Sequence, residues 1–164
     1  MPATAQAMSS AQREVTITRV FNAPRSLVFR MWTDAKHLAQ WWGPREFTNP
    51  VCELDVRPGG AIRVVMRGPK GTSYDADFPM SGTFQEIIEP ERIVFTTVAE
   101  DNDGNPQIKG ITTVTFTEAN GKTTLTLVSR ATALVPVGVQ MIEGMQAGWT
   151  QSIDKLGELV ARSR

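Results

Sequence analysis

VGVQMIEGMQAGWTQSIDKLGELVAR, residues 137–162, is the longest stretch of this chain with one sustained periodicity. Its apolar residues recur at spacings of three and four, which is the pattern of a helix with one apolar face. These residues are Val139, Ile142, Met145, Trp149, Ile153, Leu156 and Val160. The rest of the chain has the patterns of short strands, so we expect a single long C-terminal helix that packs against a β-sheet.

Two glycines, Gly144 and Gly148, lie one turn apart inside this predicted helix. Each costs a helix about 1 kcal/mol relative to alanine, so their presence indicates a need for space beside the backbone. One interpretation is close packing of the helix on the sheet. The other is a cavity beside the helix, with Met141, Met145 and Trp149 as adaptable apolar lining.

The length of 164 residues is that of one domain with a substantial core. We expect residues 1–13, which are small and polar, to form a disordered leader, and residues 14–164 to form the single domain. No apolar run is long enough to cross a bilayer, and the leader lacks the apolar centre of a secretory signal. A cytoplasmic location is therefore expected.

Charge and cysteine content exclude several classes of function. The 17 Lys and Arg residues equal the 17 Asp and Glu residues, so no net field favours nucleic acid or an anionic membrane. Cys52 is the one cysteine, which rules out an internal disulfide and a multi-cysteine metal site.

The first part of the domain is predicted as one strand followed by two short helices. EVTITRVF, from Glu14, alternates as a strand does, and Pro24 suits the first turn of a helix. Asp34 can cap a second short helix, which Gly43 and Pro44 end.

Six further strands follow, most of them joined as hairpins. Cys52 to Val56 and Ile62 to Met66 alternate on either side of a Pro-Gly-Gly turn, and Asn120-Gly121 is a strong hairpin signal. The other strands are expected at 80–88, 92–98, 107–117 and 122–130. The order β, α, α, six β, α predicts an α+β fold in which an antiparallel sheet is covered by the C-terminal helix.

Catalytic and cofactor motifs are absent from the sequence. His37, the single histidine, has the setting of a solvated helix face, and Cys52 lies on the apolar side of a strand. The glycine pairs at Gly59-Gly60 and around Gly68 lack the strand-to-helix context of a phosphate loop. We therefore predict no cofactor, no metal site and no catalytic residue.

Large apolar residues and seven methionines favour a pocket between helix and sheet that can repack around a guest. The predicted cavity lining is Trp42, Phe47, Arg63, Met66, Tyr74, Met80, Phe95, Met141, Met145 and Trp149. Arg63 is the charged exception on its strand: it either pairs with a carboxylate such as Glu53 or Glu86, or anchors a ligand carboxylate.

Several segments together resemble a known family, over about residues 14–162. They are NAPRSLVFRMWTD (22–34), WWGP (41–44), VCELDVRPGGAIRVVMRGPKGT (51–72), SGTFQEIIEPERIVFT (81–96) and GMQAGWTQSIDKLGEL (144–159). They are similar to bacterial proteins of the activator-of-heat-shock-protein-90-ATPase type, within the SRPBCC superfamily of START-like, birch pollen allergen-like and polyketide cyclase-like domains.

The resemblance implies the helix-grip fold: a curved seven-stranded antiparallel sheet wrapped around the long C-terminal helix, with two short helices after the first strand. It also implies a hydrophobic cavity that takes lipids, sterols, hormones or polyketides. It supplies no shared catalytic residue, and this chain has no counterpart of the other half of the eukaryotic co-chaperone that gives the family its label.

Three functions remain open at this point. The leading one is binding of a small hydrophobic or amphipathic ligand in the cavity. The second is a cyclase, dehydratase or hydrolase that uses Glu86, Asp77 or Tyr74 as its acid or base. The third is a co-chaperone that stimulates a heat-shock ATPase and docks through an exposed apolar patch at residues 41–44. A homodimer through the sheet edges is a further open alternative.

Overall fold

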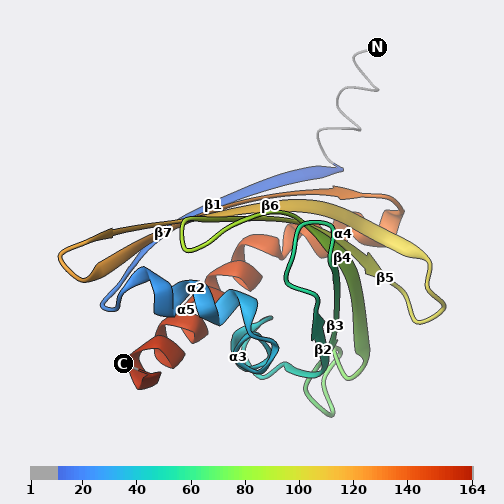
Figure 1. The fold of residues 1–164 in the computed structure, drawn as a ribbon. Coiled ribbons are helices and arrows are strands. Elements are labelled where there is room, and N and C mark those ends of the chain that lie inside the picture. The colour runs from blue at the N-terminus through green and yellow to red at the C-terminus, as the bar shows by residue number, and fades with distance from the viewer. Residues whose placement is uncertain (1–10, 164) are drawn as a thin grey trace.

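The computed structural model describes residues 11–163, whose strands form one curved antiparallel sheet of seven strands (Figure 1). Along the sheet the order is β1-β7-β6-β5-β4-β3-β2. The strands are β1 (Gln12–Phe21), β2 (Thr48–Leu54), β3 (Ala61–Arg67), β4 (Asp77–Ile88), β5 (Arg92–Glu100), β6 (Pro106–Ala119) and β7 (Lys122–Ala133). The predicted α+β class, strand number and element order are confirmed.

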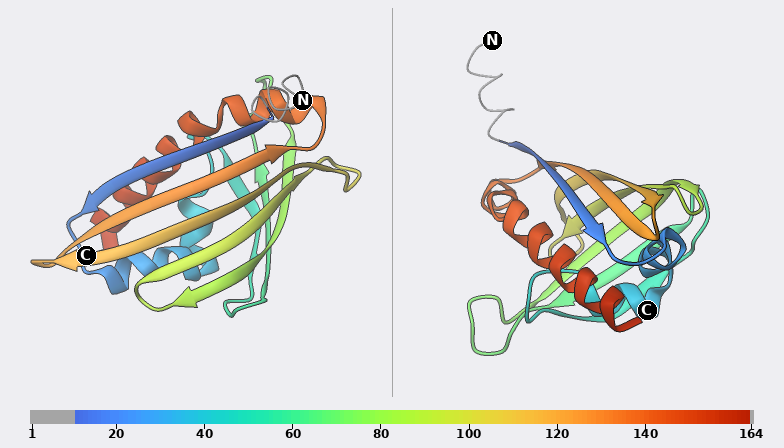
Figure 2. Two further views of the ribbon diagram at one scale, coloured as in Figure 1. Left: turned by 90° about the horizontal axis from the view of Figure 1, so that it is seen from above. Right: turned by 90° about the vertical axis from the view of Figure 1, so that its left-hand side faces the viewer.

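Helices cover only the concave face of the sheet. Two short helices, α2 (Arg25–Thr33) and α3 (Ala35–Trp41), follow β1, and α4 (Pro136–Glu143) and α5 (Met145–Ser163) end the domain. Helix α5 crosses the concave face obliquely, as the two turned views show (Figure 2). Its apolar stripe is buried as predicted, with Ile153 and Leu156 fully inaccessible to solvent, so burial of this stripe holds the helix on the sheet.

The prediction of one continuous C-terminal helix is wrong at Gly144. The helix stops there, with φ −87° and ψ 1°, and the Gly144 amide donates to the carbonyl of Met141 at 3.2 Å. Helix α5 then begins at Met145. Glycine has the lowest helix propensity of the residues nearby, so the interruption of the helix falls on it.

Several strand boundaries differ from their predicted positions. Strand β1 begins at Gln12, two residues before the predicted start, and residues 1–10 of the predicted leader lie outside the described residues. Val56 lies beyond the end of β2 and is 40% exposed. The Asn120-Gly121 hairpin is confirmed, with φ values of 56° and 75°.

Alternation along each strand sends its apolar residues into one core on the concave side. In β3, for example, Ile62 and Val64 are buried and Arg63 between them is not. No helix within residues 11–163 is both long enough and apolar enough to span a membrane.

Candidate functional site

A cavity of about 260 Å³ lies between the sheet and the junction of α4 with α5. Side chains or backbone from strands β3 to β7, from both helices and from the segment after α3 line it. The lining residues are Trp42, Gly43, Pro44, Met66, Met80, Thr97, Ala99, Ile108, Gly110, Thr112, Ser129, Arg130, Ala131, Met141, Ile142, Met145, Gly148, Trp149 and Ser152. Six of the ten residues predicted to line a cavity are in this set.

Gly148 on α5 and Gly110 on β6 lie in opposite walls of the cavity, and neither adds a side chain to it. The nearest neighbour that a Cβ added to Gly148 on α5 would meet is the Cγ of Pro44, at 3.9 Å. Likewise, a Cβ on Gly144 would meet only the Met141 carbonyl, at 3.7 Å. Close packing therefore does not explain these helix glycines. On the sheet, a Cβ on Gly110 would lie 3.0 Å from the carbonyl oxygen of Arg130 and 3.2 Å from the hydroxyl of Thr97, so close packing within the sheet also favours this glycine.

Aromatic rings form one end of the cavity. Trp42 and Trp149 contact edge to face with ring centroids 5.3 Å apart, and Trp149 stacks on Trp32 at 6.3 Å. Phe95 lies 6.1 Å from Trp42, beside a void of about 20 Å³ that also borders Trp42 and Met80. The predicted lining residue Phe95 thus borders this side void instead of the main cavity.

A wider groove of about 690 Å³ lies outside the cavity and shares part of its wall. Met66, Met141 and Met145 border both spaces, so the flexible thioether side chains stand between groove and cavity. The predicted lining residues Phe47 and Tyr74 belong to this outer groove, where their rings lie 6.0 Å apart. A guest entering from solvent would meet these two rings before the methionines.

Arg63 is not part of the cavity wall. Its guanidinium donates to a carboxylate oxygen of Glu100 and to the hydroxyl of Ser81, each at 2.8 Å. It alternates with the buried Ile62 and Val64, which places it on the opposite face of the sheet. Of the two roles considered for Arg63, the structure therefore shows the ion pair, with Glu100 as the partner in place of Glu53 or Glu86.

The acid and base candidates of the enzyme hypothesis also lie outside the cavity. Asp77 pairs with Arg67 at 2.9 Å and Glu86 pairs with Arg92 at 2.7 Å, with all four side chains at least two-fifths exposed. Tyr74 is 58% exposed in the outer groove. No Asp or Glu lines the 260 Å³ cavity within the part of the chain that the structure describes.

The prediction that Trp41 and Trp42 form an exposed patch for a protein partner is wrong for Trp41. Trp41 is completely buried, and its indole nitrogen donates to the carbonyl of Met31 at 3.0 Å. Trp42 is partly buried and faces the cavity. Trp41 is therefore not available to a protein partner, whereas Trp42 and Pro44 are only partly covered.

Polar contacts fasten the segment after α3 to helix α5 at the cavity mouth. The backbone amide of Arg45 donates to Gln151 Oε1 at 3.0 Å, and the Arg45 guanidinium pairs with Glu158. This guanidinium lowers the pKa of the Glu158 carboxyl. Lys155 donates to the Pro44 carbonyl at 3.1 Å, and burial lowers the pKa of its ammonium group. These contacts hold Pro44 over the opening.

Three buried hydroxyls in the cavity wall were missed by the sequence reasoning. Thr112 and Ser129 are 2% and 4% exposed and hydrogen-bond to each other at 2.8 Å across β6 and β7. Ser152 on α5 is 4% exposed and donates to the Gly148 carbonyl at 3.0 Å. A signal existed: Thr112 and Ser129 both occupy positions on the apolar side of their strands' alternation.

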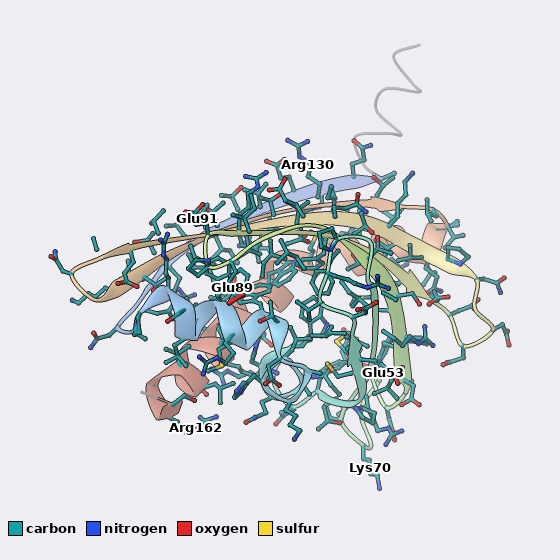
Figure 3. The ribbon with its side chains drawn as sticks, in the orientation of Figure 1. Glu53, Lys70, Glu89, Glu91, Arg130 and Arg162 are labelled. Atoms are coloured by element: carbon teal, nitrogen blue, oxygen red, sulfur yellow. The ribbon has the colours of Figure 1, made fainter. Side chains whose placement is uncertain are left out.

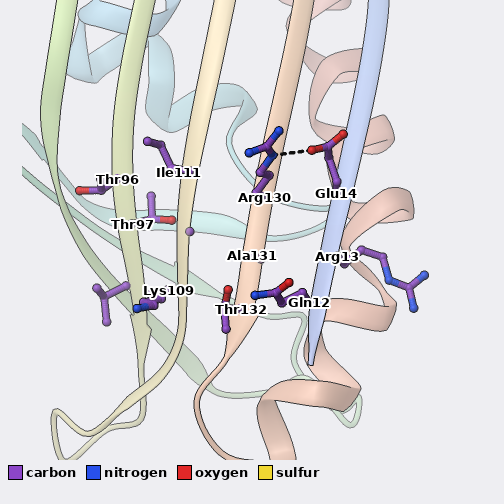
Figure 4. Close-up of a pocket in the computed structure, with 12 residues that line it drawn as sticks. Gln12, Arg13, Glu14, Thr96, Thr97, Lys109, Ile111, Arg130, Ala131 and Thr132 are labelled. Atoms are coloured by element: carbon purple, nitrogen blue, oxygen red, sulfur yellow. Dashed lines mark hydrogen bonds and ion pairs between the residues drawn. The ribbon is translucent and has the colours of Figure 1, made fainter. Parts of the chain in front are cut away.

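A larger hollow of about 800 Å³ lies on the outer face of the sheet, over β1, β5, β6 and β7 (Figure 4). Its side chains are mostly Thr, Lys, Arg and Gln, and Arg130 pairs there with Glu14. Figure 3 shows Arg130 on this convex side, away from the helices. Four of its twelve lining residues are charged, namely Arg13, Glu14, Lys109 and Arg130, whereas Arg130 is the one charged residue among those that line the cavity under the sheet. The cavity is therefore the better candidate site for an apolar guest.

Cys52 has no acidic or basic activator in the structure. Burial, and then the carboxylate of Glu53, raise the pKa of its thiol to about 11. No group of three His, Cys, Asp or Glu residues within 11–163 could hold a metal ion. Cys52 is thus a poor nucleophile in the folded protein.

We expect the Cys52 thiol to react with Ellman's reagent at pH 7 about a hundredfold more slowly in the native protein than in urea, because its thiolate population falls by that factor. The unfolded state loses the thiol proton first, so this group's stabilisation is complete below pH 9.0 and is lost as pH rises to about 11. Cys52→Ser is the control. Equal rates in the two states would contradict the prediction.

Residues 22–161 match the family described as "Activator of Hsp90 ATPase homolog 1-like protein", AHSA1. The chain belongs to this family. The match spans nearly the whole of the described domain, and it confirms the resemblance seen in the sequence. No curated protein matches the chain.

Solved structures with the same fold include several bacterial proteins. Protein Ms6760 from Mycobacterium smegmatis is 26% identical with a TM-score of 0.74, covering 96% of this chain and 95% of its own. Protein CV1439 from Chromobacterium violaceum is 26% identical with a TM-score of 0.72, covering 90% and 96%. The AHSA1 protein of Silicibacter pomeroyi shares the fold at 23% identity and a TM-score of 0.73, covering 93% and 100%.

Proposed function

We propose that this AHSA1-like protein binds a small hydrophobic or amphipathic molecule in the cavity between the sheet and helices α4 and α5. The observation that carries the proposal is the cavity of about 260 Å³ between apolar walls, which two glycines on opposite sides keep free of side chains. Ligand sites are typically concave, apolar and provided with a few polar groups.

The driving force for binding would be removal of apolar surface from water, at roughly 25 cal/mol per Å². The tryptophan rings at one end offer flat faces and edges to an aromatic or alicyclic guest. Met66, Met141 and Met145 could repack around guests of different shape, since a thioether side chain has three rotatable bonds and few steric demands. A guest larger than the cavity would extend into the outer groove between Phe47 and Tyr74.

Neither of the other two functions has a comparable observation. The titratable side chains named for catalysis lie in exposed ion pairs or in the outer groove. Of the two tryptophans named for a chaperone partner, Trp41 is completely buried and Trp42 is partly buried. The binding function is therefore the one that the geometry supports best.

Thermal unfolding in the presence of fatty acids, sterols and aromatic polyketides tests the proposal. A ligand that binds only the native state at a hundred times its dissociation constant stabilises the protein by about 2.7 kcal/mol. For a domain of this size we expect the melting temperature to rise by about 5–10 °C with at least one class.

Gly148→Leu provides the matched variant, because its side chain would occupy the space that the glycine leaves open. We expect this variant to fold and to lose the ligand-induced rise in melting temperature. Ala161→Leu adds the same side chain to an exposed site near the end of α5 and should respond like the wild type. No rise with any class, or an equal rise in Gly148→Leu, would rule out the cavity as the binding site.

A further inference from the structure

Buried polar side chains are concentrated in the cavity wall. Among residues 11–163, the buried polar residues are Thr112, Thr123, Ser129 and Ser152. All except Thr123 line the cavity. Thr123 has a structural partner elsewhere, since its hydroxyl donates to the Ala23 carbonyl at 2.7 Å. Burying a hydroxyl costs free energy unless it is hydrogen-bonded. Ser152 donates its one hydrogen to the Gly148 carbonyl, so the Thr112 and Ser129 pair is the part of this set that can still donate.

The hydrogen count of the Thr112 and Ser129 pair leaves one donor without an acceptor. Each hydroxyl carries one hydrogen. The contact of 2.8 Å between the two oxygens uses one of these hydrogens, and it is the one hydrogen bond that either side chain makes within residues 11–163. The second hydrogen is therefore available to an acceptor inside the cavity.

Charge in the cavity wall limits the chemistry of that acceptor. Arg130 is the one charged residue among the lining residues, and its guanidinium pairs with Glu14 on the outer face of the sheet (Figure 4). An ionised carboxylate placed at the hydroxyl pair would lose its hydration without gaining a cation, which is costly. A neutral oxygen suits the site better, and a carbonyl oxygen accepts a hydrogen bond without bringing a further donor that needs a partner.

We propose that Thr112 and Ser129 form a donor pair that selects uncharged, largely aromatic ligands carrying a carbonyl oxygen. This inference rests on the proposed binding function and specifies its ligand class. The carbonyl accepts the free hydroxyl hydrogen at the sheet wall, and the ring system lies against Trp42 and Trp149 at the aromatic end.

Fluorenone and fluorene test the inference, because the two share a tricyclic skeleton and differ by the carbonyl group. Their dissociation constants are measured by isothermal titration calorimetry for the wild type and for Thr112→Val/Ser129→Ala. We expect the preference for fluorenone over fluorene to fall about tenfold in the double variant, the value of one good hydrogen bond. Replacing both partners at once leaves no orphaned hydroxyl, so the variant should fold.

Thr123→Val is the matched control, since it removes a buried hydroxyl that does not face the cavity. It should keep the wild-type preference. An unchanged preference in the double variant, with fluorene still bound, would overturn the hydroxyl inference and leave the binding function standing. Failure of both compounds to bind the wild type would overturn the inference, while the binding function would still be decided by the thermal unfolding test with all ligand classes.

A second measurement needs no variant. The infrared carbonyl stretch of fluorenone bound to the wild-type protein should lie at lower frequency than in an alkane solvent, because hydrogen bonding weakens the carbonyl bond. A frequency equal to that in alkane would show that the carbonyl has no donor in the cavity and would overturn the inference.

Discussion

Replacement of Trp41 by alanine should destabilise the protein by about 4 kcal/mol, as buried tryptophan truncations do. Trp41 is fully buried at the end of α3, and its ring lies edge to face with Trp32 at 4.5 Å. Truncation would leave a large void under the helices and remove the donor for the Met31 carbonyl. Urea unfolding monitored by circular dichroism would measure the loss.

Trp41→Phe separates the contribution of ring packing to stability from that of the hydrogen bond to the Met31 carbonyl. The ring is largely retained, so the cost should fall to about 1–3 kcal/mol, which reflects the unsatisfied Met31 carbonyl and a smaller void. A cost below about 1 kcal/mol for Trp41→Ala would mean that this tryptophan is accessible in solution. That result would restore the exposed patch that was first expected at residues 41–44.

Replacement of Gly82 by alanine should lower the unfolding free energy by at least about 3 kcal/mol. Gly82 lies in β4, and a Cβ there would fall 1.9 Å from the backbone carbonyl oxygen of Thr96 in β5. A backbone atom cannot rotate away as a side chain can, so β4 and β5 would have to separate. Urea unfolding, together with the yield of folded protein, would measure the effect.

Gly148→Ala is the matched substitution, and we expect it to raise the unfolding free energy, whereas Gly82→Ala lowers it. The nearest neighbour of its Cβ would be the Cγ of Pro44, at 3.9 Å, and the substitution removes a glycine from inside helix α5. The unfolding free energy should rise by about 0.5–1 kcal/mol, because alanine loses less backbone entropy in a helix than glycine does. Similar losses for Gly82→Ala and Gly148→Ala would contradict the distinction drawn between a packed strand glycine and a cavity glycine.

Much of the candidate site was predictable from residue type and position. Trp42, Met80 and Trp149 line the cavity as expected, and Met66, Met141 and Met145 stand between it and the outer groove. Their positions follow from the sequence pattern because large apolar residues on the core side of a strand or helix must face the space between the two layers.

Other site predictions failed because they depended on neighbours distant in sequence. Arg63 was a candidate anchor until Glu100, 37 residues later, proved to be its partner. Trp41 seemed available for a partner because its burial under α2 and the sheet is not visible in the local sequence. The Thr112 and Ser129 pair requires the register of β6 against β7, which residue patterns do not specify.

The sequence by itself determined the fold class, the seven strands and the helical C-terminus, because hydrophobic periodicities of two and of about 3.6 residues are local properties of the chain. Tertiary structure decided where the last helix breaks, which face holds Arg63, and that Gly110 and Gly148 lie on opposite walls of one cavity. A cavity is a gap between elements, so its existence and its lining depend on how those elements pack, and no single segment carries that information.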